Sequence, residues 1–142
     1  MPHIELRELH DDDRDAAFSA IHASASAWQR AAFDDRTSFD AWTDRADVAA
    51  LVIVRDASVI GLAAAMDVEG DREILLAVAP GADSDASTEA LRLLTAREAD
   101  RPLYACVAAS DEPSHDVLAR IGFVEQQRDG DDVVYVLPPT LE

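Results

Sequence analysis

Residues 73–94 read EILLAVAPGADSDASTEALRLL, and this stretch decides the fold. Its first part, Glu73–Val78, has strand length and is apolar at every position after the glutamate, and the Pro-Gly pair at 80–81 ends it. Small and acidic residues follow, and then alanine and leucine recur at the spacing of one helix face. The stretch therefore predicts a buried strand, a loop of small residues and a helix over Ala86–Ala99.

The flanking sequence predicts further elements on both sides. Apolar runs bounded by turn residues predict strands at His3–Leu9, Ala49–Val54, Val59–Val68, Leu103–Ala108, Phe123–Arg128 and Val133–Leu137. Helices are predicted after the capping carboxylates Asp11–Asp13, with Ala17, Ile21, Ser24 and Trp28 on one face, over Ser38–Arg45, and from Pro113 to the stop at Gly122. The order of elements predicts a mixed α/β (α+β) fold, in one domain of residues 1–142.

The charge of the chain is strongly one-sided. Twelve basic residues, all arginine, stand against 29 acidic ones, which gives a net charge of −17. A surface of this sign repels nucleic acid and anionic lipid and attracts a small amine or a basic peptide. We therefore expect no nucleic-acid or membrane partner, although coding bias or a high-salt cytoplasm also produces such a composition.

Cysteine and histidine give no sign of a disulfide or a metal site. Cys106 is the only cysteine, and the four histidines stand far apart in the sequence. No apolar run reaches the roughly 20 residues that span a bilayer, and Met1–Leu9 has no targeting pattern. The sequence therefore predicts a cytoplasmic protein without a metal.

Several of these segments together resemble the GNAT superfamily of acyl-CoA-dependent N-acyltransferases. The segments are Val78–Pro80, the small-residue loop Gly81–Ser87, the apolar helix through Leu91 and Leu94, and Ile121-Gly122-Phe123. The resemblance implies a mixed central sheet of about seven strands and about four helices, with a V-shaped splay between the fourth and fifth strands. It also implies that backbone groups of Leu76, Ala77 and Val78 pair with the pantetheine arm of acetyl-CoA, and it allows a homodimer.

The loop that would bind the cofactor's pyrophosphate departs from the family pattern. That pattern places an Arg or Gln, a Gly, and a second Gly or Ala ahead of the helix, and these positions hold Asp83, Ala86 and Thr88. Glycines let helix amides approach a phosphate closely, whereas a carboxylate repels it. The implied cofactor loop, made of Asp83, Ser84, Asp85, Ala86, Ser87 and Thr88, therefore predicts weak or lost acetyl-CoA binding. The alternative is that its acids only cap a structural helix.

The catalytic positions implied by the resemblance are also altered. The family often has an Asn before the last helix and a Tyr near its end, and these positions hold Asp111 and Leu118. Because leucine cannot transfer a proton, water, His115 or Tyr104 would have to protonate the leaving thiolate. Glu73 is the candidate base. The alternative for both Glu73 and His115 is an exposed side chain without a catalytic role.

Two functions remain open at this point. One is a GNAT-type N-acyltransferase that moves an acetyl or acyl group from acyl-CoA to a primary amine. The other is a catalytically dead GNAT-fold module for binding, regulation or dimerisation, which the residues of the phosphate loop favour. A further possibility concerns the cofactor: arginines such as Arg92 or Arg120 would anchor CoA in a different way.

Overall fold

The computed structural model describes residues 3–23, 35–78, 84–98 and 102–138. Its strands form one mixed sheet in the order β1-β2-β3-β4-β5-β7-β6. The strands are β1 (Ile4–Glu8), β2 (Ala49–Arg55), β3 (Ser58–Val68), β4 (Asp71–Val78), β5 (Leu103–Ala108), β6 (Val124–Asp129) and β7 (Asp132–Leu137). A short 3₁₀ helix η1 (Asp11–Asp13) precedes α1 (Arg14–Ala23), and the other helices are α2 (Arg36–Thr43), α3 (Ser84–Arg97) and α4 (Glu112–Ile121). The predicted order of elements and the mixed seven-stranded fold class are confirmed.

The observed boundaries differ from the predicted ones by a few residues. The helix expected from Ala86 begins at Ser84, which places Asp85 in its first turn. A carboxylate is favourable there because the helix dipole is positive at that end. The helical positions expected at Ser24 and Trp28 lie outside the described residues.

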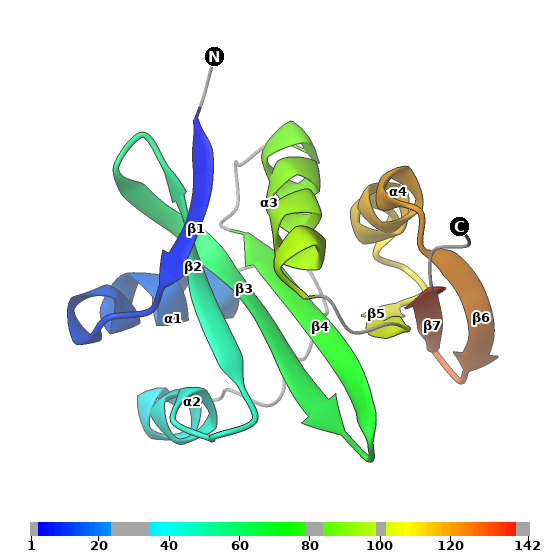
Figure 1. Ribbon diagram of the computed structural model, residues 1–142, viewed down its shortest axis with the longest axis horizontal. Helices are drawn as coiled ribbons and strands as arrows, with labels where there is room; N and C mark the ends of the chain where they lie inside the picture. The colour runs from blue at the N-terminus through cyan, green and yellow to red at the C-terminus, as the bar shows by residue number, and fades with distance from the viewer. Residues whose placement is uncertain (1–2, 24–34, 79–83, 99–101, 139–142) are drawn as a thin grey trace.

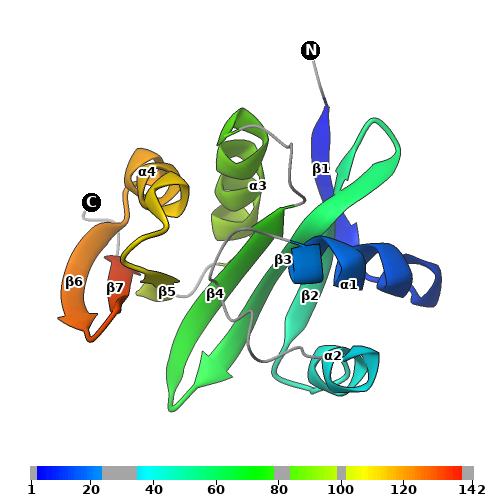
Figure 2. The same cartoon turned by 180° about the vertical axis from the view of Figure 1, so that it is seen from behind.

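Helices cover both faces of the sheet. Helices α1 and α2 lie on one face and α3 lies on the other, as Figures 1 and 2 show from opposite sides. On the first face Phe39 of α2 is fully buried, and its ring lies 5.6 Å from the ring of Phe18. On the second face Leu91 and Leu94 of α3 are fully buried, so the predicted apolar stripe of this helix packs into the core.

The two halves of the sheet are joined by a short parallel pairing. Strands β4 and β5 pair only at Arg72 with Leu103 and at Glu73 with Tyr104. Beyond these pairs β4 continues to Val78 along β3, and β5 continues to Ala108 along β7. The strands therefore diverge over their carboxyl-terminal halves, and the predicted V-shaped splay is confirmed (Figure 1).

Candidate functional site

The alternation of side chains along β4 assigns its residues to the two faces of the sheet. Arg72 Nε donates to Glu98 Oε1 at 2.8 Å, just after α3, so Arg72 lies on the α3 face. Because side chains alternate along a strand, Leu76 and Val78 share that face, and Glu73 lies on the face covered by α1 and α2. The backbone of β4 between these side chains borders the gap of the V.

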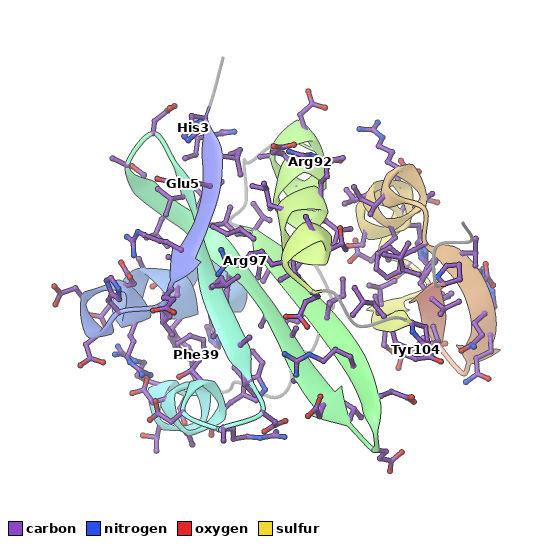
Figure 3. All side chains as sticks on the ribbon, viewed as in Figure 1. His3, Glu5, Phe39, Arg92, Arg97 and Tyr104 are labelled. Carbon is purple, nitrogen blue, oxygen red and sulfur yellow. The ribbon has the colours of Figure 1, made fainter. Side chains whose placement is uncertain are left out.

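Glu73 and Tyr104 meet at the point where the V closes. They are direct partners in the parallel pairing, and partner side chains project from the same face of a sheet. Both are half-buried. Figure 3 shows Tyr104 by β5, on the side of the molecule that also holds β6 and β7. The structure thus places a carboxylate and a phenol at neighbouring positions of paired strands, a placement that the sequence gives no means to foresee.

The sequence-predicted backbone partners Leu76, Ala77 and Val78 form the last three residues of β4. Each pairs with β3 on one side, and on the other side none has a β5 partner within the described chain. Backbone N–H and C=O groups on such an edge are free to pair with an extended ligand. This part of the site needs no particular side chain.

The start of α3 carries most of the predicted phosphate loop. Asp83 lies outside the described residues, as does the side chain of Ser84. Asp85 projects into solvent, with its side chain 93% exposed, and Ser87 and Thr88 are half-buried. Ala86 is 4% exposed and packs in the core, so its methyl group points away from the open end of the helix.

Arg120 of α4 approaches this helix start from the side. Its Nη1 lies 3.8 Å from Asp85 Oδ1, and both side chains are largely exposed. An exposed pair at this distance contributes little to stability. Arg92, the other candidate anchor, donates to both carboxylate oxygens of Glu89 at 2.8 and 2.6 Å. Arg120 is therefore the better placed of the two arginines for a phosphate at the start of α3.

Asp111 occupies the residue before α4 but does not cap the helix with its side chain. Ser114 Oγ donates to Asp111 Oδ2 at 2.6 Å, and the backbone N–H of Ser114 donates to the Asp111 carbonyl at 3.1 Å. The carboxylate of Asp111 therefore accepts from the hydroxyl group of Ser114 and not from a backbone amide of the first turn. A hydroxyl–carboxylate bond of this kind fixes the first turn of α4.

His115 is half-buried and bonded through both ring nitrogens. Its Nε2 lies 3.1 Å from the carbonyl oxygens of Ala108 and Ala109, and its Nδ1 contacts the Tyr135 hydroxyl group at 2.5 Å. Because carbonyls only accept, Nε2 carries a proton toward Ala108 and Ala109, and Nδ1 shares a hydrogen bond with the Tyr135 hydroxyl group. His115 thus joins α4 to the end of β5 and to β7, which differs from the solvent-exposed alternative.

Tyr135 and Leu118 complete the surroundings of α4. Tyr135 is 8% exposed, and burial raises the pKa of its phenol, as does the charge of Glu125. Leu118 stands where the resemblance implies a proton donor, and it is fully buried in the core. In this chain the α4 position therefore contributes packing and no acid, which leaves Tyr104 as the phenol nearest the apex of the V.

The described surface also has an open hollow of about 480 Å³ away from the V. It lies between the end of β1, the start of β2, the end of α2 and the last turn of α3, and it is lined by Glu8, Thr43 and Arg97 among others. Figure 3 shows Arg97 pointing from α3 toward β2.

Within the described residues no helix is long and apolar enough to cross a membrane. No group of three or more His, Cys, Asp or Glu side chains in the same part of the chain has the arrangement of a metal site.

Comparison with known proteins identifies the fold. No protein-family model matches the chain, and no curated protein matches it by sequence. Among solved structures, a GNAT-family acetyltransferase from Bacillus cereus superposes with a TM-score of 0.74 at 14% identity, covering 98% of this chain and 99% of that one. An acetyltransferase from Agrobacterium tumefaciens gives 0.73 at 19% identity, covering 96% and 91%. The PaiA N-acetyltransferase of Thermoplasma acidophilum, solved with coenzyme A, gives 0.68 at 14% identity, covering 96% and 99%. The chain has the GNAT acyltransferase fold.

The residues present fit one part of an acyl-CoA molecule and not the other. The free edge of β4 suits the pantetheine arm, which binds through amide groups. The start of α3 presents the exposed carboxylate of Asp85 where the resemblance places the pyrophosphate, and within the described part of the chain the pairing with Arg120 at 3.8 Å offsets its charge.

Proposed function

We propose that this protein is an N-acyltransferase that moves an acetyl or other acyl group from acyl-CoA, or from a related pantetheine thioester, to a primary amine. The observation that carries the proposal is the short β4–β5 pairing, which ends after Glu73 and Tyr104 and leaves the edge of Leu76–Val78 open. That edge supplies main-chain partners to an extended donor. The GNAT fold of the solved neighbours supports the same reaction class, as an analogy of fold.

The reaction needs one group that accepts a proton and one that donates a proton. The thioester supplies an activated acyl carbon, which the amine nitrogen attacks as the carbon–sulfur bond breaks. Glu73 accepts the proton that the ammonium group must lose, directly or through water, and the Tyr104 hydroxyl group protonates the departing thiolate. The nitrogen loses a second proton as the amide forms, and water carries that proton to the Tyr104 oxygen. Glu73 then releases its proton to solvent, so the products are an amide, a free thiol and one proton.

The acceptor is a cation before it reacts. A protein with a net charge of −17 concentrates cationic amines near its surface, and Glu73 offers the amine a carboxylate at the apex of the V. A small amine or a basic peptide is therefore the acceptor class that we propose.

A second candidate function is a GNAT-fold module that binds a ligand or partner without catalysis. Leu118 favours this alternative, because a fully buried leucine stands where the family resemblance implies a proton donor. The exposed Asp85 at the start of α3 favours it as well.

The test combines calorimetric titration of acetyl-CoA with a free-thiol assay on a panel of small primary amines. Glu73→Gln and Tyr104→Phe should each lower kcat by about 100-fold, the lower range for loss of a general acid or base, while donor affinity stays within about twofold. Glu69→Gln, at the exposed β3–β4 turn, is the matched control and should keep full activity. Donor binding without thiol release across the panel and from pH 6 to 10 would favour the non-catalytic module.

A further inference from the structure

We infer that the donor site discriminates against phosphate, so that the preferred donor is an acyl thioester of pantetheine without phosphates and not acyl-CoA. The inference rests on the acyl transfer proposed above and names the donor class for that reaction. It follows from the contrast between the two ends of the site, one bordered by neutral backbone and the other by the exposed carboxylate of Asp85.

The thioester end of the site is neutral and independent of sequence. Leu76, Ala77 and Val78 border the gap with backbone groups, and their side chains are buried or half-buried in the sheet. Pantetheine carries two amides, whose N–H and C=O groups match such an edge. Nothing at this end selects for or against a charge farther along the donor.

The opposite end of the site presents an exposed carboxylate. Asp85 stands in the first turn of α3 with 93% of its side chain exposed, so it faces whatever approaches the helix amides. Among the described residues Arg120 pairs with it at 3.8 Å, and Arg92 is bonded to Glu89. The helix start therefore offers its positive dipole to a carboxylate of the protein itself and not to a phosphate.

The field of the whole molecule acts in the same direction. The protein carries a net charge of −17, and coenzyme A carries about four negative charges on its phosphates at neutral pH. Each phosphate added to the donor increases the repulsion, and salt reduces it because the charges at this surface are exposed. A donor without phosphates avoids the whole of this repulsion.

A pantetheine thioester can be free or attached to a carrier protein. A series of donors with increasing numbers of phosphates distinguishes these two sources. S-acetyl-pantetheine is uncharged, S-acetyl-4′-phosphopantetheine represents the group attached to a carrier protein, and acetyl-CoA carries the full set of phosphates. We expect kcat/KM to fall along this series, with S-acetyl-pantetheine about tenfold above acetyl-CoA at 50 mM NaCl and within about threefold at 0.5 M NaCl. A maximum at the singly phosphorylated donor would overturn the phosphate-free assignment in favour of a carrier-bound donor.

A charge-reversal variant tests the role of the helix start. Asp85→Lys should raise kcat/KM for acetyl-CoA about tenfold and leave S-acetyl-pantetheine within twofold. Glu69→Lys is the control, because it changes net charge by the same amount in the exposed turn at the other end of β4 (Figure 1). In the Glu69→Lys control, kcat/KM for acetyl-CoA should change by no more than about twofold.

Binding measured without the amine separates this inference from the proposed function. Backbone amide shifts of Leu76 and Val78 report the occupation of the slot by each donor in the absence of turnover. If S-acetyl-pantetheine binds more tightly than acetyl-CoA but no amine is acylated, the donor preference holds and the proposed catalysis fails. If acetyl-CoA binds or reacts better than the uncharged donor at low salt, or if no donor shifts these amides, the inference is wrong.

Discussion

Gly61 of β3 determines how closely β3 and β4 approach beside the open end of the V. Gly61 is the register partner of Val78, and a methyl group added at Gly61 would lie 2.2 Å from the Ala77 carbonyl oxygen and 3.0 Å from Val78 Cα. Ordinary contact begins at 3.4 Å, so the added carbon and the carbonyl must separate by about 1.2 Å. Because the obstructing atoms belong to the backbone, rotation of a side chain cannot relieve the clash.

Gly61→Ala should therefore destabilise the fold and displace the residues proposed to hold the donor. Overpacking of this kind costs about 1–3 kcal/mol. We expect the free energy of unfolding to fall by about 2 kcal/mol, measured from the shift of the urea unfolding midpoint. The amide shifts of Ala77 and Val78 should move in the ligand-free protein, and donor affinity should fall about tenfold.

Gly70→Ala provides the matched control at the other end of the same strand pair. Gly70 has a φ of +90° and no atom within 4 Å of the added carbon, so the cost there is conformational strain of about 1–2 kcal/mol. The two variants should lose similar stability, while only Gly61→Ala moves the Ala77 amide. If Gly61→Ala unfolds within 0.5 kcal/mol of the wild type and leaves that amide in place, the steric reasoning is refuted.

Three further perturbations test other parts of the structure. Ala57 has a φ of +72° in the β2–β3 turn, so Ala57→Gly should stabilise the protein by about 1 kcal/mol in urea unfolding, and a loss of stability would contradict the turn geometry. Asp13 accepts two hydrogen bonds from Arg7, which lower the pKa of its carboxyl, so its stabilisation is present above pH ~4 and is lost as the pH falls through the lowered pKa. The difference in unfolding free energy between the wild type and Asp13→Asn should therefore be largest at pH 7 and shrink below pH 4. Finally, a net charge of −17 predicts that the melting temperature rises from 20 mM to 0.5 M NaCl, and a steady fall would mean that repulsion among the acidic side chains does not limit the stability of the fold.

The sequence was sufficient to predict the two strands beside the splay because each has a distinct local pattern, whereas the splay itself was implied by the family resemblance. Glu73–Val78 is apolar at every position after the glutamate, as expected for a strand covered on both faces, and Leu103–Ala108 is an apolar run of similar length. The structure confirms both strands and their divergence. Local patterns of this kind predict elements well, because they depend on burial and not on distant partners.

The surroundings of the candidate site depend on contacts between segments that lie far apart in the sequence. His115 meets Tyr135 because β7 pairs with β5, and Asp85 meets Arg120 because α3 packs beside α4. No periodicity reports such contacts, so an exposed His115 was a reasonable expectation and was wrong. The strand glycine at Gly61 did carry a usable signal, because an isolated glycine in a strand often marks a close approach of backbone.

The catalytic roles of Glu73 and His115 stay predictions, and the structure ranks them differently. Glu73 stands at the apex of the V beside Tyr104, where a proton acceptor and a proton donor serve the same bond rearrangement. His115 holds two carbonyls and one hydroxyl group, so any proton transfer through its ring would first have to break the junction between β5 and α4. A substitution at His115 should therefore loosen this junction, whereas a substitution at Glu73 should act on the chemical step.

The two ends of the donor site respond differently to changes in sequence, and this explains how the chain can keep the fold while losing the phosphate pattern. The β4 edge binds through main-chain groups, which any set of strand-forming side chains leaves in place. The start of a helix can bind phosphate only through its amides and nearby charges, and Asp85 adds a negative charge in the first turn of α3 without disturbing the helix. Ala86 adds a constraint, since it packs in the core and its replacement by glycine would weaken the helix. Restoring a phosphate site therefore requires a change of charge at Asp85 and no change at Ala86, which makes Asp85→Lys the more informative single substitution for donor choice.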